Sequence, residues 1–265
     1  MEQVAVIDLG SNSIRFIIIE ITQNGSHKLV YQEKESIRLS AGMLENNMCL
    51  TEEAQQRALK LLSVYAHIIE SQHIHTVLAV ATAAVRNARN GASFIKRVRA
   101  KTGIPMTVIS GYAEATLGFS GVIHTIDEKD FLLFDLGGAS IEISLVKNKK
   151  RVKSISIPIG AVTLTQKFDS SDEISSSQRK EMEGFISSQL HRISWLPKSG
   201  LPVIGIGGTV RNLAKMHQRK TGYPLPKLHN YRLPVKELFK MIDFLSRTSA
   251  HERENISGLS EERTD

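Results

Sequence analysis

Residues 132–145 read LLFDLGGASIEISL. An apolar run ends at Asp135, turns through Gly137 and Gly138, and resumes with alternating residues at 141–144, which predicts a β-hairpin. A glycine-rich turn lets backbone N–H groups point inward and hold an anion, and a carboxylate at the strand end could hold a cation against it. A tight structural hairpin with a solvent-facing aspartate also fits this segment alone.

The chain opens with a second copy of this pattern. The apolar residues 4–7 end at Asp8, a turn follows through Ser11, Asn12 and Ser13, and residues 14–21 form another predicted strand. The two aspartates lie 127 positions apart, at 8 and 135. The repeat predicts two related domains facing each other across a cleft: residues 1–124 with a phosphate loop at 8–13, and residues 125–265 with a phosphate loop at 135–140.

The composition is typical of a folded enzyme or binding protein. Hydrophobic residues make up 41% of the 265 residues, and no apolar run approaches the roughly 18 residues of a membrane span. The N-terminus has neither a basic region nor a cleavage site, so we expect a cytoplasmic protein. The single cysteine, Cys49, excludes an internal disulfide, and the nine histidines lack zinc-ligand spacing.

The formal net charge of +7 indicates an anionic partner. Nucleic acid, an anionic membrane surface and a phosphate-rich molecule or polymer all fit this charge. The densest basic runs are KNKKRVK at 147–153 and KRVRAK at 96–101. Each run also fits a solvated turn or helix end, so charge alone does not select the partner.

Two charged residues follow strands of the first predicted domain. Arg86 comes after the strand at 76–81, and Glu114 lies in the first turn of the helix at 112–122, after the strand at 106–109. Ligands of open α/β sheets bind at the carboxyl ends of strands, where both side chains are expected. The alternatives are an exposed structural arginine and a glutamate that interacts with the helix dipole.

A third glycine-rich turn follows the predicted strand at 201–206. Gly207, Gly208 and Thr209 begin a helix whose N-terminal N–H groups could contact an anion. Neither GxGxxG spacing nor GxxxxGK[ST] occurs, which argues against a dinucleotide-binding fold and a P-loop enzyme. Further predicted elements are a helix after an N-cap at Thr51, helices at 92–103 and 172–196, a strand at 152–159 and one helix within 233–265.

Six motifs occur in this order along the chain: AVIDLGSNSIRFIII, VATAAVRNARNG, VISGYAEATLGFSGV, FDLGGASIEIS, IPIGAVTLTQKF and VIGIGGTVRNLA. Their order resembles that of the exopolyphosphatase and guanosine pentaphosphate phosphohydrolase family, within the actin-like ATPase superfamily. The resemblance extends over residues 4–263, and GLSEERTD at 258–265 is similar to the family's GLxxxRAD segment.

This resemblance implies an α/β fold of two ribonuclease-H-like (actin-like ATPase) domains facing an interdomain cleft, and hydrolysis of a terminal phosphoanhydride bond with Mg²⁺. It makes Glu114 the carboxylate that activates water, Arg86 a phosphate contact and Asp135 a catalytic metal ligand. The implied phosphate-binding residues are Ser11, Asn12, Ser13, Gly137, Gly138, Ala139, Ser140, Gly207, Gly208 and Thr209, and the implied metal ligands are Asp8, Asp135 and Glu142.

Three departures from the family pattern stand out. Ala113 occupies a position where the family often has a carboxylate, and Ala139 replaces the third glycine of the second loop. Alanine adopts most backbone conformations except those with positive φ, so we expect the second change to be mild. Family chains continue beyond the last residue here, so we expect the second domain to be truncated.

The resemblance predicts an exopolyphosphatase that removes orthophosphate processively from the polyphosphate terminus. Guanosine pentaphosphate is the alternative substrate within the family, and the positive net charge slightly favours the polymer. Outside this activity, a catalytically weak binding module for polyphosphate or guanosine polyphosphates and a kinase-like phosphotransferase stay open. We expect neither a membrane nor a specific nucleic acid as partner, and a homodimer remains an option.

Overall fold

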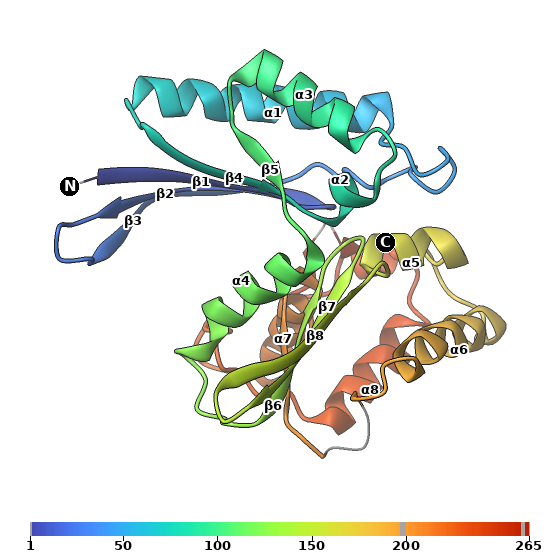
Figure 1. The fold of residues 1–265 in the computed structure, drawn as a ribbon. Coiled ribbons are helices and arrows are strands. Elements are labelled where there is room, and N and C mark those ends of the chain that lie inside the picture. Colours follow the sequence, from blue (N-terminus) through green and yellow to red (C-terminus); the bar gives the residue numbers. More distant parts are fainter. Residues whose placement is uncertain (1, 197–199, 261–262, 265) are drawn as a thin grey trace. The chain divides into compact units, whose positions relative to one another are not determined.

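The structure is a computed structural model that describes residues 2–196, 200–260 and 263–264. It divides into two compact units, Met1–Glu114 and Ala115–Asp265, and each contains one sheet with helices against it (Figure 1). The division lies inside helix α4 (Gly111–Ile123). The domain boundary predicted at 124/125 falls just after the end of the same helix.

The first unit contains a five-stranded sheet with the strand order β3-β2-β1-β4-β5. The pairs β1–β2 and β2–β3 are antiparallel, whereas β1–β4 and β4–β5 are parallel. The strands are β1 (Glu2–Leu9), β2 (Ser13–Ile21), β3 (His27–Ser36), β4 (Thr76–Ala81) and β5 (Met106–Val108).

Helices α1 (Glu52–Ser71) and α3 (Gly91–Thr102) lie together against one face of this sheet (Figure 1). The predicted N-cap of α1 is confirmed, because Thr51 Oγ1 accepts a hydrogen bond of 3.2 Å from Ala54 N. Satisfying this N–H supports the start of the helix by about 1 kcal/mol. Helix α2 (Ala83–Asn87) connects β4 to α3.

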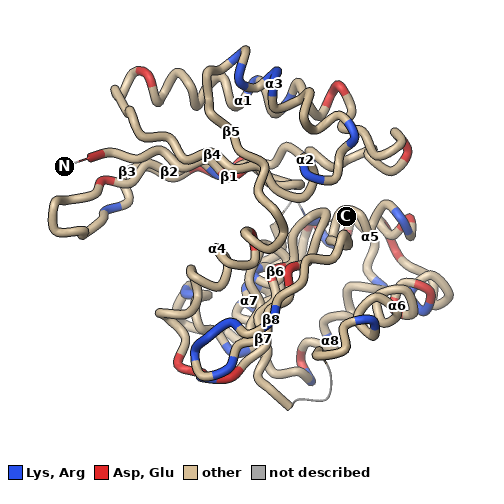
Figure 2. The backbone as a smooth tube through the Cα atoms, viewed as in Figure 1, with Lys and Arg blue, Asp and Glu red and all other residues tan. Residues whose placement is uncertain are grey.

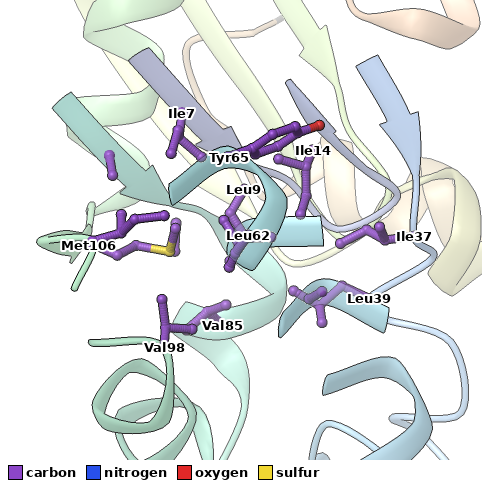
Figure 3. Close-up of a cluster of buried hydrophobic side chains, with 14 of the residues drawn as sticks. Ile7, Leu9, Ile14, Ile37, Leu39, Leu62, Tyr65, Val85, Val98 and Met106 are labelled. Carbon is purple, nitrogen blue, oxygen red and sulfur yellow. The ribbon is translucent and has the colours of Figure 1, made fainter. Parts of the chain in front are cut away.

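Alternate residues of β1 and β2 face this helical layer, as the two-residue period of a strand requires. Ile7, Leu9 and Ile14 are completely buried, and Figure 3 shows them in one cluster with Leu62 and Tyr65 of α1. Each fully buried aliphatic side chain contributes roughly 1.5–3 kcal/mol by leaving water. Leu9 and Ile14 are the last pair before the turn that connects β1 to β2, so their burial holds both ends of this turn in place.

The second unit repeats this strand arrangement. Its sheet has the order β8-β7-β6-β9, in which β6–β7 and β7–β8 are antiparallel and β6–β9 is parallel. The order and directions match those of β3-β2-β1-β4 in the first unit. The strands are β6 (Phe131–Leu136), β7 (Ile141–Lys147), β8 (Lys150–Ile157) and β9 (Val203–Ile206).

Helices cover both faces of the second sheet. Val122 of α4 packs with Phe131 and Leu133 against one face, while Phe185 of α6 packs near Ile143 on the other. The helices after α4 are α5 (Ala161–Phe168), α6 (Ser176–His191), α7 (Gly208–Thr221), α8 (Val235–Leu245) and α9 (Ala250–Arg253). Among the described residues, no helix combines the length and apolar composition needed to cross a membrane.

The predicted α/β class with two ribonuclease-H-like sheets is confirmed by the shared strand order. The predicted hairpin at 132–145 is the antiparallel pair β6–β7, and the strand predicted at 76–81 has the same bounds as β4. The helix predicted at 172–196 is shorter, because Ser175 is the N-cap of α6 and the helix ends at His191.

Four elements had no prediction of their own, namely strand β3 and helices α2, α5 and α9. Strand β3 is exposed along nearly its whole length, so its sequence lacks the apolar alternation that signals a strand. Helix α2 has five residues and α9 has four, too few to establish helical periodicity. Residues 261, 262 and 265 of the GLSEERTD segment lie outside the described residues.

Candidate functional site

The turn between β1 and β2 is the first predicted phosphate loop. Gly10 N donates to Ser13 O over 3.0 Å and closes the turn. The buried Ser11 hydroxyl accepts a 3.1 Å hydrogen bond from Ala84 N at the start of α2. Within the described residues, the N–H groups of Ser11 and Asn12 donate to no backbone carbonyl. They are therefore candidate donors to an anion.

The turn between β6 and β7 has the same closure, because Gly137 N donates to Ser140 O over 3.0 Å. The N–H groups of Gly138, Ala139 and Ser140 find no backbone acceptor in the part of the chain that the structure describes. Ala139 has no positive φ, which agrees with the expectation that alanine is tolerated there. The two turns thus present similar sets of N–H donors.

Helix α5 braces the second turn from behind. Ala161 N donates to Gly137 O over 2.9 Å, and Val162 N donates to Gly138 O over 2.9 Å. The approach is so close that a Cβ on Gly160 would lie 2.5 Å from the Ala139 nitrogen. The first N–H groups of α5 therefore hold the turn through its carbonyls, and they do not occupy the N–H groups of the turn.

Arg86 and Glu114 form an ion pair in the first unit. Arg86 Nη1 donates to Glu114 Oε2 over 2.8 Å and to Ile109 O over 3.0 Å. The side chains are 20% and 19% exposed, so the pair is reachable from solvent but partly desolvated. Helix α2 carries the arginine and the first turn of α4 carries the glutamate. Two residues that the sequence predicted separately thus lie in direct contact.

Asp135, Glu142 and Ser156 form a row across β6, β7 and β8. Asp135 is directly opposite Glu142, and Glu142 is directly opposite Ser156. Directly opposed residues project from the same face of a sheet. Glu142 is only 3% exposed, and its Oε1 accepts from Ser140 Oγ at 2.9 Å and Ser156 Oγ at 2.6 Å. These hydrogen bonds set the direction of the buried carboxylate.

The third glycine-rich turn lies beside Asp135. Gly207 has a φ of 96°, and a Cβ there would lie 2.8 Å from Asp135 Oδ1. Glycine is therefore required both by the backbone conformation and by the carboxylate. Helix α7 begins at the next residue, Gly208, so its N-terminal N–H groups start close to Asp135. This turn and the Asp135–Glu142 pair form one neighbourhood within the second unit.

Arg263 is a site residue that the sequence did not single out. Its Nη1 donates to Thr209 Oγ1 over 2.8 Å, and its Nη2 lies 2.2 Å from the position of a Cβ on Gly208. A guanidinium over the N-terminus of a helix faces the positive end of the helix dipole, an arrangement that a bound anion would stabilise. The sequence pattern that could have identified Arg263 is the similarity of GLSEERTD at 258–265 to the family's GLxxxRAD segment.

Asp8 closes β1 in the first unit, where Arg15 lies directly opposite on β2. Burial raises the pKa of the Asp8 carboxyl above its usual value, and the charge of Arg15 partly counteracts this rise. The elevated pKa means that the site favours either a proton or a cation beside this carboxylate. Its predicted role as a metal ligand stays a prediction.

The donor set for Mg²⁺ consists of carboxylates. Among the described residues, no three Asp, Glu, His or Cys side chains gather into a metal-binding group. Mg²⁺ is commonly held by one or two carboxylates together with substrate phosphates, rather than by an all-protein cage. The opposed pair Asp135 and Glu142 lies next to a turn whose N–H groups at 138–140 have no backbone acceptor among the described residues, and it fits this mode of binding.

The basic run at 147–153 forms the turn between β7 and β8, where lysine and arginine follow one another along the backbone (Figure 2). Lys147 pairs with Asp130 at 3.7 Å, and Lys149 donates to the Ile126 carbonyl. Arg151 donates to Thr116 over 2.6 Å. Much of this run therefore contacts its own unit, as expected for a turn.

Comparison with known protein families identifies the family to which this chain belongs. Residues 17–265 match the Ppx/GppA phosphatase family. The chain belongs to this family. Membership confirms the resemblance inferred from the six motifs and agrees with the predicted class of enzyme, a phosphatase.

Three similar proteins illustrate the membership. The bifunctional 3-dehydroquinate synthase/phosphatase of Fusobacterium nucleatum is 31% identical over 98% of this chain, and the chain spans 41% of that protein's length. Exopolyphosphatase 1 of Mycobacterium leprae is 26% identical over 98% of this chain and 78% of the relative. The crystal structure of an exopolyphosphatase from Cytophaga hutchinsonii is 27% identical, with a TM-score of 0.88, over 100% of this chain and 86% of that one.

The predicted site residues thus form local groups in each unit of this Ppx/GppA chain. The first unit brings Arg86 and Glu114 together and links Ser11 to the helix that carries Arg86. The second unit brings Asp135, Glu142 and the turn at 137–140 together with Gly207. The roles of all these residues stay predictions.

Proposed function

We propose that this chain hydrolyses the terminal phosphoanhydride bond of inorganic polyphosphate and releases orthophosphate. The observation that carries the proposal is the contact between Arg86 and Glu114, 2.8 Å apart at the start of α4. It pairs a cation suited to phosphate with a carboxylate suited to binding water. The similarity to proteins named exopolyphosphatases supports the substrate class.

In the proposed reaction, the oxygen of a water molecule attacks the terminal phosphorus while the bridging P–O bond breaks. Glu114 accepts one proton of that water, and the shortened chain leaves with the bridging oxygen. General-base catalysis of this kind typically contributes 10²- to 10⁴-fold to the rate. Arg86 would stabilise negative charge on the phosphoryl oxygens and keep the Glu114 carboxylate in one orientation.

The turns would bind the phosphate groups. Among the described residues, the N–H groups of residues 11–12 and 138–140 have no backbone acceptor, so they would be available to donate to phosphate oxygens. A divalent cation held at this site would supply positive charge against the phosphate groups. Asp135 and Glu142 would hold the ion, with Ser140 and Ser156 orienting the Glu142 carboxylate.

Polyphosphate is favoured over guanosine pentaphosphate by charge. The net charge of +7 attracts a long polyanion through many contacts, whereas a nucleotide gains from fewer. Both substrates present a terminal phosphoanhydride, so the chemistry described above applies to either one. A direct comparison of the two is therefore part of the test.

The test is phosphate release by the purified chain with Mg²⁺ and, in separate reactions, long-chain polyphosphate, guanosine pentaphosphate and ATP. We expect the highest kcat/KM with polyphosphate and loss of turnover when the divalent cation is chelated. Higher efficiency with guanosine pentaphosphate would replace the proposed substrate. Tight binding without release from any of the three would indicate a binding module, and ADP formation that requires an added acceptor would indicate a phosphotransferase.

A further inference from the structure

Helix α7 carries a row of cations that the proposed reaction does not use. We propose that Arg211, Lys215 and Arg219, here called the α7 basic row, hold a long polyphosphate chain beyond the phosphate-binding turns. The inference rests on the proposed function, since it extends the same substrate along the protein surface. It concerns binding of the polymer and not the chemical step.

The row follows from helical geometry. Its members are four residues apart on a helix that runs from Gly208 to Thr221. Four residues advance about 6 Å along a helix and rotate by about 40°, so the three side chains lie along one face. All three residues are exposed. The row therefore forms a line of positive charge about 12 Å long.

The row has no acidic counterpart on its own helix, because residues 208–221 contain neither Asp nor Glu. Within the described residues, none of the three cations forms an ion pair. Like charges at i and i+4 on a helix repel each other and destabilise it slightly. The folded chain thus carries a small electrostatic cost that a bound polyanion would relieve.

Two other helices of the second unit, α6 and α8, pair some of their charges. Arg179 of α6 binds Glu183, four residues later, at 2.9 Å. Lys240 of α8 binds Glu237 at 2.6 Å, and Glu237 also lies 3.5 Å from Lys220 at the end of α7. The α7 basic row departs from this arrangement, so an ordinary salt-bridged surface does not account for it.

The position of the row connects it to the candidate site. Arg211 lies in the first turn of α7, directly after the glycine-rich turn at 207–209. That turn approaches Asp135, and its Thr209 hydroxyl contacts Arg263. A linear anion with one end at the glycine-rich turn could therefore continue along Arg211, Lys215 and Arg219.

The composition of α7 favours a linear polyphosphate over other anionic partners. A helix that lies on a membrane needs an exposed apolar face, but none of the exposed large hydrophobic residues of the described chain lies in α7. Single-stranded nucleic acid is usually held by aromatic stacking, and residues 208–221 contain no Phe, Trp or Tyr. A polymer of bare phosphates requires only the line of charge.

The experiment measures binding and turnover of the triple variant Arg211→Ala/Lys215→Ala/Arg219→Ala. The matched control is Lys180→Ala/Lys236→Ala/Arg247→Ala, which removes three exposed cations elsewhere in the same unit. Fluorescence anisotropy with end-labelled long-chain polyphosphate, tripolyphosphate or single-stranded RNA, each with a chelator present, gives dissociation constants without hydrolysis. Titrations at several salt concentrations give the slope of log affinity against log salt.

We expect the triple variant to bind long-chain polyphosphate roughly tenfold more weakly, with a salt slope shallower by about 2. Tripolyphosphate is too short to extend from the turn along the row, so its affinity should be the same as in the unmodified chain. The control should retain both affinities. Unchanged long-chain affinity, or equal weakening of both polyphosphates, would overturn the inference, and stronger row-dependent binding of RNA would reassign the surface to nucleic acid.

Failure of the proposed function gives a different result. Row-dependent binding of long-chain polyphosphate by a chain that releases no phosphate would support the row and refute the hydrolase. Normal phosphate release with a row variant indistinguishable from the control in affinity and in KM for long chains would refute the row alone.

Discussion

Arg86 and Glu114 contact each other over 2.8 Å although 28 positions separate them in the sequence. The arginine also donates to the Ile109 carbonyl, so one guanidinium group links the end of β5 to the first turn of α4. A substitution of either residue therefore changes the surroundings of the other. A variant that tests Glu114 should therefore keep a hydrogen-bond acceptor for Arg86.

Glu114→Gln should abolish most turnover while keeping the fold. Glutamine has the same shape and an oxygen that can accept from Arg86 Nη1, but it cannot take a proton from water. We expect phosphate release to fall by about 10²- to 10⁴-fold, with long-chain polyphosphate still bound. Phosphate release and thermal unfolding, measured on the same preparation, check this.

The control for this variant is Glu183→Gln, which alters an exposed glutamate that pairs with Arg179 on α6. It should keep both turnover and melting temperature. Undiminished phosphate release by Glu114→Gln would contradict the assignment of Glu114 as the general base. A large drop in melting temperature would instead show that the ion pair mainly supports the fold.

Gly207→Ala and Gly184→Ala should change stability in opposite directions. Gly207 has a φ of 96°, and its added Cβ would lie 2.8 Å from Asp135 Oδ1. Backbone strain alone costs about 1–3 kcal/mol. Gly184 lies inside α6 with no atom within 4 Å of the added Cβ, so alanine should stabilise by roughly 0.5–1 kcal/mol. Denaturant unfolding gives both values, and a stable Gly207→Ala variant would contradict the close approach to Asp135.

Ser156→Ala should weaken the response to Mg²⁺ if Glu142 is a metal ligand. The variant removes the 2.6 Å hydrogen bond to Glu142 Oε1 and leaves the buried carboxylate with less orientation. Loss of such a supporting group typically weakens metal affinity 10- to 100-fold. We therefore expect a higher Mg²⁺ concentration for half-maximal phosphate release, while Ser156→Thr, which keeps a hydroxyl, should restore much of the response. An unchanged Mg²⁺ requirement would count against this role of Glu142.

Glu52→Gln should lower stability near neutral pH but not in strong acid. Hydrogen bonds with Arg97, and then with Gln56, lower the pKa of the Glu52 carboxyl from 4.5 to about 2. A carboxyl whose pKa is lower in the folded state stabilises that state at pH values above the ordinary pKa of 4.5. This contribution disappears as the pH falls from about 4.5 towards 2. The melting-temperature difference between the variant and the unmodified chain should shrink across this interval. Glu53→Gln, one residue away, is the matched control, because it removes a carboxylate from the same helical turn without removing the hydrogen bonds to Arg97 and Gln56.

The sequence predicted the main elements of both sheets because their apolar strands are buried. Asp8 and Asp135 mark equivalent turns, and each turn is closed by the same hydrogen bond, at Gly10–Ser13 and Gly137–Ser140. Strand β3 was not predicted, because its side chains are mostly exposed. It is held by backbone pairing to β2 and buries little side-chain surface, so its residues carry no periodic signal.

The grouping of the candidate site depended on contacts between distant residues. The order of the motifs named Arg86 and Glu114, but only the folded chain showed that their two charges lie in contact. Register alone placed Ser156 opposite Glu142, since a shift by one residue would turn the hydroxyl to the other face. Arg263 contacts Thr209 from 54 positions away, and no local sequence pattern predicts that these two residues meet.

The sequence by itself determined the family, the repeated turn and the chemical types of the candidate residues, because these follow from local patterns of glycine, carboxylate and apolar residues. Tertiary structure alone decided which charges pair and which stay exposed. Arg86 is held by Glu114, whereas Arg211 of the α7 basic row remains in solvent, although both are arginines close to a predicted phosphate-binding turn. The difference arises from burial and register, which depend on contacts between residues far apart in the chain.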